Sequence, residues 1–406
     1  MATKRIAIIG AGASGMIAAV MAARNGAKVV LIEQNAQLGR KILSTGNGKC
    51  NFTNTHMEIG CFHGEDKAIG TVLEQFTVSD TITFFSELGI LVKDRDGYLY
   101  PKSEQAKSMV DVFTMELKRL KIDILCDTRV LTTQKKGHAF ILKTTKQTIT
   151  CDRLIIATGG KAAPKLGSDG SGYQLAKSFG HSIVPVLPAL VQLRCKGKFF
   201  RQIAGVRTEA KITILIDKKK VVEDTGEVQL TEYGISGIPV FQVSRHAAVG
   251  LYEKRTVSAM IDFLPFIESS ELEQVLEKRA NLAHHKTAEE FLVGMFNQKL
   301  IPVLLEAASI HINAKVSTLE SKHFQQLAEV CKFFQVIVEK TNGFEAAQVC
   351  AGGVKTTEIN SKTMESMLVE GLYFTGELLD VEGKCGGYNL QWAWSTGWIA
   401  GCHTAR

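Results

Sequence analysis

Short unbroken runs of apolar residues alternate with small-residue and amphipathic stretches over the first third of the chain. The runs Arg5–Ile9 and Lys28–Ile32 flank an alanine-rich stretch from about 14 to 24, which ends at Asn25-Gly26. Such apolar runs are typical of strands in a parallel sheet covered on both faces, and Asn-Gly is typical of the end of a helix. The pattern therefore predicts a β-α-β unit over residues 4–33.

Further along, the pattern predicts more helices and another strand of the same sheet. Residues 66–88 have a helical pattern, and at 104–120 the apolar residues lie on one helical stripe. Asp152–Ala157 is again largely apolar, and it predicts a buried strand that leads into Thr158-Gly159-Gly160. Residues 138–150 alternate in polarity as a hairpin does.

The character of the sequence changes near 185–188. From about 190 to 262, strand-like runs follow one another with turn signals between them, which predicts a small barrel or sandwich. From about 266 to 330 the pattern is helical and polar, and after Phe333 strands return. We therefore expect an α/β fold in which a Rossmann-like domain (1–190 and 336–406) is interrupted by a β-rich domain (191–262) and a helical domain (263–335).

Composition excludes several classes of protein. The chain has 406 residues, of which 45% are hydrophobic and 22% charged, so it can bury a sizeable core and is neither disordered nor a collagen. Nine cysteines without a C-x-x-C pair or a zinc-like spacing predict reduced thiols, a cytoplasmic protein and no metal site. No stretch approaches the roughly 20 apolar residues that span a bilayer, so no membrane partner is expected.

The formal charge of +7 permits an anionic ligand without requiring a nucleic acid. Lysines and arginines are scattered, and no basic stripe is interleaved with aromatic residues. We therefore expect a small-molecule substrate and no nucleic-acid partner.

The start of the chain resembles a secretory signal, because Lys4-Arg5 precede an uncharged stretch that reaches Ala23. Glycines at 10, 12 and 15 interrupt that stretch. They fit a strand, a turn and a helix better than a signal peptide.

The turn Gly10-Ala-Gly12-Ala-Ser14-Gly15 is the first candidate binding motif. It follows a predicted strand, opens a predicted helix and precedes an acidic residue, Glu33, by 18 positions. This context is typical of dinucleotide binding, with the diphosphate at the helix N-terminus and the acidic side chain on the ribose hydroxyls. An acidic residue there disfavours a 2′-phosphate, so this pocket is not expected to hold NADP.

Two later segments extend this site. Thr158 and Gly159 end the strand predicted at 152–157. Near the C-terminus, Leu372–Phe374 leads into Thr375-Gly376-Glu377, then Asp380, and the pair Gly386-Gly387 opens a last helix. Because NAD needs only one continuous Rossmann unit, segments this far apart favour FAD as the single cofactor. The N-terminus of the last helix would stabilise negative charge on reduced flavin, with Glu377 and Asp380 near the ribityl or diphosphate.

The segment Gly39–Asn54 combines glycines, basic residues and asparagines in a loop-like composition. Its sequence resembles the signature of the BaiN-like bacterial flavoproteins, and Tyr233–Pro239, Cys350–Val354 and Gly376–Gln391 also match that family. The resemblance covers essentially the whole chain. It implies a two-dinucleotide-binding FAD domain with an inserted β-barrel-like domain and a helical domain.

The resemblance also implies which residues line the flavin. Arg40 and Lys41 would in any case supply cations near the diphosphate or the flavin N1 edge. The backbone glycines expected to approach FAD include Gly46 and Gly387. The residues that the resemblance places on the flavin are Ser14, Glu33, Arg40, Lys41, Cys50, Asn51, Val130, Thr158, Asp380 and Asn389.

Three functions fit these features. The first is a flavin oxidase for a small amine such as aminoacetone, with oxygen as electron acceptor, which the resemblance suggests. The second is an NAD(P)H-dependent reductase of a conjugated ketone, for which NAD(P)H would dock transiently because no second complete G-x-G-x-x-G occurs. The third is a flavin-dependent nucleic-acid modifier or a flavin-binding partner protein. No side chain is recognisable as a catalytic base, so the sequence assigns no catalytic residue.

Overall fold

The computed structural model describes residues 3–405, which divide into two compact units. The discontinuous unit comprises Met1–Leu187 and Gln348–Arg406, and the inserted unit comprises Pro188–Ala347. The expected boundary at 335/336 falls inside a strand of the inserted unit, and the expected β-rich and helical domains belong to one compact unit.

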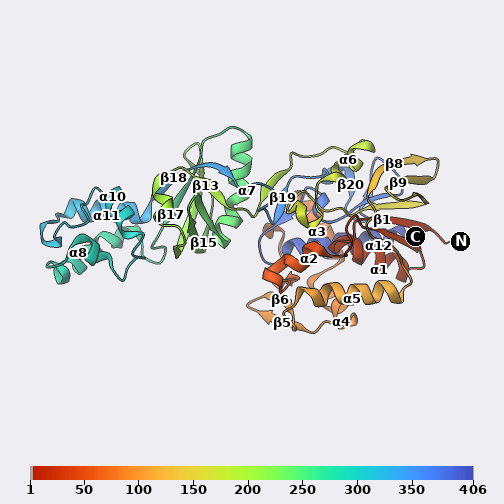
Figure 1. Ribbon diagram of the computed structural model, residues 1–406, viewed down its shortest axis with the longest axis horizontal. Coiled ribbons are helices and arrows are strands. Elements are labelled where there is room, and N and C mark those ends of the chain that lie inside the picture. Colours follow the sequence, from red (N-terminus) through yellow and green to blue (C-terminus); the bar gives the residue numbers. More distant parts are fainter. Residues whose placement is uncertain (1–2, 406) are drawn as a thin grey trace. The chain divides into compact units, whose positions relative to one another are not determined.

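A seven-stranded sheet forms the centre of the discontinuous unit, in the order β20-β21-β22-β11-β1-β2-β7 (Figure 1). The five strands from β22 to β7 are parallel, whereas β20 and β21 add an antiparallel edge. Four of the parallel strands, β1, β2, β11 and β22, are almost entirely buried, as their unbroken apolar sequences predict, whereas β7 at the edge is partly exposed. Their bounds are β1 (Arg5–Ile9), β2 (Lys28–Ile32), β7 (Asp123–Leu125), β11 (Arg153–Ile156), β20 (Ile359–Asn360), β21 (Glu365–Ser366) and β22 (Leu372–Phe374).

Two helices from opposite ends of the chain pack tightly in this unit. They are α1 (Ala13–Arg24) and α12 (Tyr388–Thr404). A Cβ on Gly397 would overlap the carbonyl oxygen of Ser14, and one on Gly401 would lie 2.5 Å from the carbonyl oxygen of Ala18. Glycines on α12 therefore allow the two backbones to approach closely. Across residues 3–405, no helix combines the length and the apolar character needed to cross a bilayer.

A three-stranded antiparallel sheet contacts β1 and β11. It consists of β8 (Val130–Lys136), β9 (Ala139–Thr144) and β10 (Thr148–Cys151), so the predicted hairpin has a third strand. The remaining elements of the unit are α2 (Arg40–Ser44), β3 (Thr53–Asn54), β4 (Phe62–His63), α3 (Asp66–Gln75), α4 (Val78–Glu87), β5 (Val92–Arg95), β6 (Tyr98–Pro101), α5 (Ala106–Arg119), α6 (Ser171–Ser178), β19 (Val349–Ala351) and β23 (Glu382–Gly383).

The helix expected over 66–88 is broken into α3 and α4. The reason lies at Thr77, whose hydroxyl accepts a hydrogen bond from the Asp80 amide, while the Asp80 carboxylate accepts one from the Thr77 amide at 2.8 Å. This reciprocal capping box begins a new helix at Val78.

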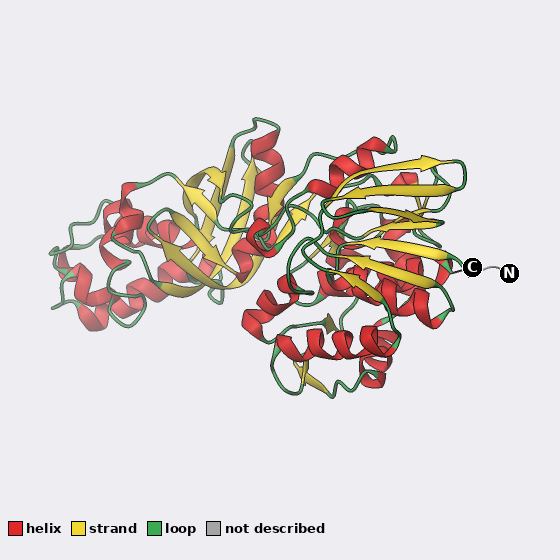
Figure 2. Ribbon diagram, turned by 45° about the vertical axis from the view of Figure 1, so that its right-hand side comes forward, coloured by secondary structure: helices red, strands yellow, loops and turns green. Residues whose placement is uncertain are grey.

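The inserted unit contains a closed six-stranded barrel in the order β13-β16-β15-β14-β17-β18, with a helical region joined to it (Figure 2). The strand β18 completes the barrel, although the sequence suggested that residues beyond 335 return to the first domain. The elements are β12 (Leu187–Ala189), β13 (Leu193–Cys195), β14 (Arg207–Ile216), β15 (Lys219–Thr231), β16 (Gly234–Gly237), α7 (Ile238–Tyr252), β17 (Val257–Asp262), α8 (Ser269–Ala283), α9 (Ala288–Leu292), α10 (Ile301–Ala307), α11 (Ser321–Lys332) and β18 (Phe334–Thr341).

The helix α7 lies inside the segment 191–262, which was expected to be β-rich. Its buried residues Val240, Val243, Ser244, Ala247 and Ala248 recur at the spacing of a helical face. Pro239 lies in the first turn of α7, where a backbone N–H would have no partner within the helix, so the missing N–H of proline costs nothing.

Candidate functional site

The carboxyl ends of the four central parallel strands bring the sequence motifs together at one edge of the sheet. β1 leads into Gly10, β2 into Glu33, β11 into Thr158 and β22 into Gly376. Ligands of open α/β sheets bind outside this edge.

The glycine turn between β1 and α1 packs closely on the protein backbone at Gly10 and Gly15 and is open at Gly12. Gly10 has a φ of 100°, and a Cβ there would lie 2.5 Å from the carbonyl oxygen of Ala157. Gly15 could not carry a Cβ without overlapping the carbonyl oxygen of Gly10. By contrast, nothing lies within 4 Å of a Cβ position on Gly12, which begins α1 without a side-chain cap. The N–H groups of the first turn of α1 therefore border open space.

Glu33 lies beside this turn and is 8% exposed. One carboxylate oxygen accepts a hydrogen bond from the Ala11 amide at 2.8 Å, and the other accepts from the Asn35 side chain at 2.6 Å and its amide at 2.9 Å. The Arg40 guanidinium donates to the Asn35 side-chain oxygen at 2.7 Å. Glu33 and Arg40 are thus joined through Asn35, a residue that the sequence analysis did not single out.

Ser14 joins the first and last motifs. Its hydroxyl accepts a hydrogen bond from the Thr375 hydroxyl at 3.1 Å, and a Cβ on Gly376 would lie 2.6 Å from the same oxygen. The Gly376 amide in turn donates to the Thr396 hydroxyl of α12 at 2.9 Å. Thr396 was also not anticipated, because its role depends on how α12 packs rather than on a local motif.

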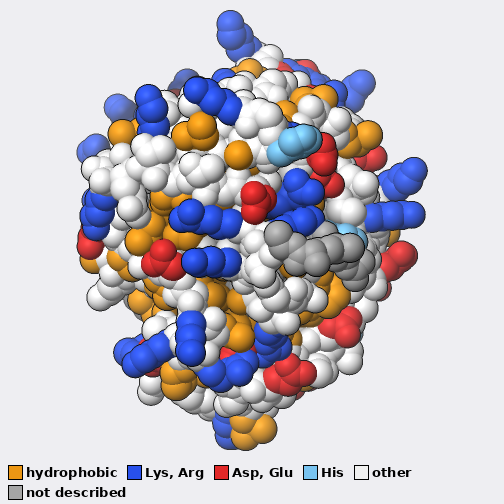
Figure 3. All heavy atoms as spheres, turned by 90° about the vertical axis from the view of Figure 1, so that its right-hand side faces the viewer, with side chains coloured by type: hydrophobic (Ala, Val, Ile, Leu, Met, Phe, Trp, Pro, Cys, Tyr) orange, Lys and Arg blue, Asp and Glu red, His pale blue; other side chains and the backbone are white. Residues whose placement is uncertain are grey.

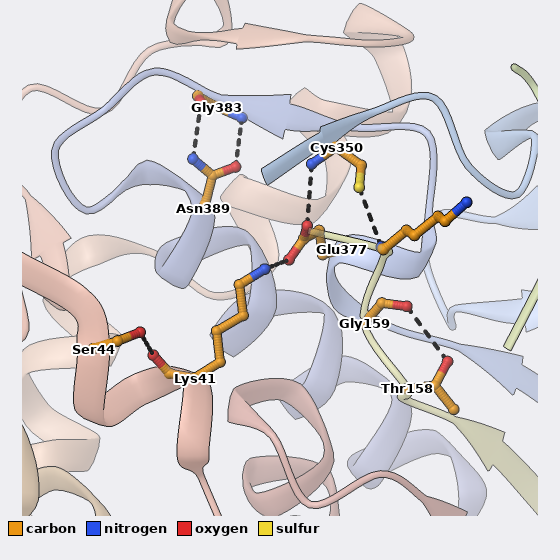
Figure 4. A network of polar contacts seen from close by, with 9 residues as sticks. Lys41, Ser44, Thr158, Gly159, Cys350, Glu377, Gly383 and Asn389 are labelled. Carbon is orange, nitrogen blue, oxygen red and sulfur yellow. Dashed lines mark hydrogen bonds and ion pairs between the residues drawn. The ribbon is translucent and has the colours of Figure 1, made fainter. Parts of the chain in front are cut away.

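Lys41 and Glu377 form an ion pair at 2.6 Å between residues 336 positions apart (Figure 4). The second oxygen of Glu377 accepts a hydrogen bond from the Cys350 amide at 3.1 Å. The Cys350 thiol accepts one from the Lys161 amide at 3.1 Å. The sequence placed Lys41 and Glu377 in the site but assigned no role to Cys350.

The loop after α2 turns sharply and presents Asn51. Gly46, Asn47 and Cys50 all have φ between 53° and 59°. Burial raises the pKa of the Cys50 thiol to about 12, so this thiol is protonated at neutral pH and acts as a packing group. Asn51 is buried, with 8% of its surface exposed. Even so, neither polar atom of its carboxamide has a hydrogen-bond partner among residues 3–405.

Asn51 lies at the N-terminus of α12. A Cβ on Gly387, which precedes that helix, would overlap the Asn51 side-chain oxygen. α12 has no side-chain cap. The Asn51 carboxamide and the free N–H groups at the start of α12 are therefore hydrogen-bonding groups that no described side chain satisfies, and together they could bind a polar ligand.

Five further predicted site residues are Val130, Thr158, Gly159, Asp380 and Asn389, of which Asn389 fixes the backbone with its side chain. The Asn389 side chain forms two hydrogen bonds with the backbone of Gly383, both at 2.8 Å. Its oxygen accepts one from the Gly383 amide, and its nitrogen donates one to the Gly383 carbonyl. The Asp380 amide donates to the Val354 carbonyl at 2.9 Å. Val130 begins β8 and is 8% exposed. Thr158 lies so close to Gly172 that a Cβ there would overlap its hydroxyl, and Gly159 has a φ of 70°.

Fold and site together define a Rossmann-type dinucleotide-binding oxidoreductase. The family profile described as "HI0933-like protein Rossmann domain" matches residues 4–403. The chain therefore belongs to this family, which confirms the resemblance to the BaiN-like flavoproteins. It is an FAD-dependent oxidoreductase.

Among relatives, a "3-dehydro-bile acid delta(4,6)-reductase" of Clostridium scindens is 50% identical over 400 residues and covers 98% of both chains. A "ribosomal RNA dihydrouridine synthase" of Escherichia coli is 32% identical and covers 96% of this chain and 95% of its own. A solved 3-ketosteroid Δ4-(5α)-dehydrogenase from Rhodococcus jostii has a TM-score of 0.52 at 13% identity, covering 99% of this chain and 97% of its own, and shows the shared fold.

The chemistry of the edge fits FAD. The open first turn of α1 suits a diphosphate. A carboxylate can accept about four hydrogen bonds and Glu33 already accepts three, so the oxygen that binds the Ala11 amide retains one acceptor site for a ribose hydroxyl. The unpaired carboxamide of Asn51 and the N-terminus of α12 suit a polar ring edge that carries both donors and acceptors.

Proposed function

We propose that this protein reduces a carbon–carbon double bond conjugated to a ketone, with NAD(P)H as the electron source. The observation that carries the proposal is the 50% identity, over 98% of both chains, to a protein named for reduction of a 3-dehydro-bile acid at Δ4,6. A 3-dehydro steroid with double bonds at these positions is a conjugated ketone. The substrate class we propose is therefore a steroid-like enone or dienone.

The proposed cofactor site uses the residues that meet at the carboxyl edge of the sheet. When bound, FAD supplies hydride transfer between a reduced donor and an acceptor. Glu33 would bind the ribose, the first turn of α1 the diphosphate, and Asn51 with the start of α12 the polar ring edge. The full proposed set is Gly10, Gly12, Ser14, Gly15, Glu33, Arg40, Lys41, Gly46, Cys50, Asn51, Val130, Thr158, Gly159, Gly376, Glu377, Asp380, Gly387 and Asn389.

Positive charge near the ring favours the reduced state. The N-terminus of α12 carries a partial positive charge, and Lys41 carries a positive charge that its ion pair with Glu377 offsets in part. Both would stabilise the negative charge that develops on a reduced flavin without any group having to move during the reaction.

Anaerobic reduction tests the reaction. We expect NADH or NADPH to bleach the visible flavin absorbance, and a 3-dehydro-Δ4,6 bile acid to restore it under nitrogen. Aminoacetone should not bleach it. If aminoacetone reduces the flavin and NAD(P)H does not, the amine-oxidase function suggested by the sequence replaces this proposal.

The same reaction class admits a second substrate. Uracil contains a C5=C6 bond conjugated to a carbonyl, and relatives from Escherichia coli and Haemophilus influenzae at 32% and 31% identity are named ribosomal RNA dihydrouridine synthases. On the face drawn in Figure 3, lysines and arginines lie scattered among acidic and apolar side chains rather than in one stripe. We therefore place the small-molecule enone first. Unmodified ribosomal RNA is the second acceptor to offer the reduced protein.

A further inference from the structure

Three segments of the discontinuous unit each bring a polar side chain to one point beside Gly160. A Cβ on Gly160 would lie 2.9 Å from a Glu377 carboxylate oxygen, 3.1 Å from the Tyr173 hydroxyl and 3.2 Å from the Cys350 thiol. The absence of a side chain at Gly160 is therefore what allows these three groups to converge. Burial, with smaller effects of Cys350 and Glu377, raises the pKa of the Tyr173 hydroxyl and keeps it protonated.

Glu377 is held in place on both of its oxygens. One accepts the Cys350 amide at 3.1 Å, and the other accepts the Lys41 ammonium at 2.6 Å. The two side chains of the ion pair are 25% and 18% exposed, so solvent screens their attraction only in part. Figure 4 shows Lys41 extending from α2 toward Glu377.

The pair lies next to the glycine turn that begins α1. α2 is attached there because the Gly39 amide donates to the Ala11 carbonyl at 2.9 Å. Gly376, which precedes Glu377, packs against Ser14 in the first turn of α1. Removing the charge of Glu377 would therefore leave the Lys41 ammonium, which lies close to the proposed cofactor, without its counter-charge.

We propose that Glu377 is a positioning residue that fixes the Lys41 ammonium beside the cofactor and partly neutralises it, so that the pair sets how strongly the protein favours reduced over oxidised flavin. This inference rests on the proposed cofactor site, in which Lys41 lies near FAD.

The midpoint potential of the bound flavin tests it, together with FAD affinity measured by fluorescence quenching. Glu377→Gln keeps the shape of the side chain but removes its charge, which leaves Lys41 uncompensated. We expect reduced flavin to gain about tenfold in binding relative to oxidised flavin, a rise of about 30 mV for a two-electron couple. Lys41→Met should lower the potential instead.

The double variant Lys41→Met/Glu377→Gln separates an effect through Lys41 from a direct effect on flavin. We expect the shift caused by Glu377→Gln to disappear when Lys41 is absent. Gly160→Ala offers an independent route, because its Cβ would push the Glu377 carboxylate away without changing any charge. It should shift the potential in the same direction as Glu377→Gln.

Lys107→Met is the matched control, since Lys107 forms an exposed ion pair with Asp111 on α5, and it should leave the potential unchanged. If Lys41→Met shifts the potential but Glu377→Gln does not, or if the Glu377→Gln shift persists without Lys41, the inference is wrong and the cofactor site stands. If Lys41→Met changes neither FAD affinity nor potential, Lys41 is not beside the flavin, and its place in the proposed site falls together with the inference.

Discussion

Single residues at the sheet edge differ in whether the protein itself satisfies them. Glu33 and Glu377 each bind backbone amides of the chain, which fixes their carboxylates before any ligand arrives. Asn51 has no such partner. Because an unsatisfied buried amide costs about 1–3 kcal/mol, we propose that a bound cofactor completes the hydrogen bonds of the Asn51 carboxamide.

The sequence predicted the motif residues but not their partners. Glu33 follows from the spacing of one β-α-β unit, whereas the Lys41–Glu377 pair joins residues 336 positions apart. Tyr173 likewise meets Cys350 and Glu377 only in the folded chain. Long-range contacts of this kind depend on how strands and helices pack, and one sequence carries no local signal for them. Asn35 differs, because it contacts Glu33 two positions away but belongs to no motif.

At the level of a single residue, we expect Glu33→Ala to weaken FAD binding. Loss of hydrogen bonds to a charged group costs about 1.5–3 kcal/mol, so we expect roughly a 10- to 100-fold higher dissociation constant for FAD. Titration of the apoprotein with FAD by fluorescence quenching measures it. Glu87→Ala, at an exposed ion pair with Arg24, is the control. Wild-type affinity in Glu33→Ala would contradict the ribose assignment.

Elements whose sequence signal is local were predicted best. β1 and β2 have the predicted bounds because unbroken apolar runs end at polar or glycine residues. α7 was missed although its buried positions have a helical period, because it lies among strand-like runs. The break at Thr77 has a weak sequence signal, because the third residue of its capping box is Asp80 and not the usual Glu or Gln.

The packing of α1 on α12 predicts the effect of Gly397→Ala. Helix propensity alone would favour alanine by about 1 kcal/mol. Since a Cβ would overlap the Ser14 carbonyl oxygen and lie 2.5 Å from the side chain of Ile17, we expect a net loss of about 1–3 kcal/mol in unfolding free energy. Urea unfolding measures it. Gly60→Ala, where nothing lies within 4 Å of the new Cβ, should be nearly neutral, and a neutral Gly397→Ala would refute the close packing.

A buried histidine links α6 to the edge of the sheet. His181 is 3% exposed and lies between the Glu358 carboxylate at 3.0 Å and the Ser366 hydroxyl at 2.8 Å. Burial lowers the pKa of His181, against an opposing effect of Glu358. The unfolded chain therefore binds a proton near pH 6.5 that the folded chain does not bind, and stability falls as pH drops below that value.

We expect the urea midpoint of the wild type to fall between pH 7.5 and pH 5.5 by more than that of His181→Gln. The variant loses the interactions of the imidazole at both pH values, so the comparison concerns the slope and not the absolute stability. Equal slopes would show that His181 titrates alike in the folded and unfolded chains.

For the whole molecule, the distribution of charge separates the two candidate substrates. The inserted unit, 188–347, has 20 lysines and arginines against 19 acidic residues, and the discontinuous unit has 28 against 22. The excess is small in both units. An RNA ligand held by six to ten phosphate contacts would lose about 10³- to 10⁵-fold in affinity between 50 and 200 mM salt, because each contact releases counterions.

We therefore expect the KM for a 3-dehydro-Δ4,6 bile acid to change by no more than about fourfold over this salt range, which is what one neutralised charge would give. Steady-state NAD(P)H consumption at several salt concentrations measures it, and the same series with unmodified ribosomal RNA provides the comparison. Turnover of RNA that is lost steeply with salt, together with no turnover of the bile acid, would make uridine the substrate. It would also show that a surface with only a small excess of positive charge is enough to bind an RNA substrate of this flavin reaction.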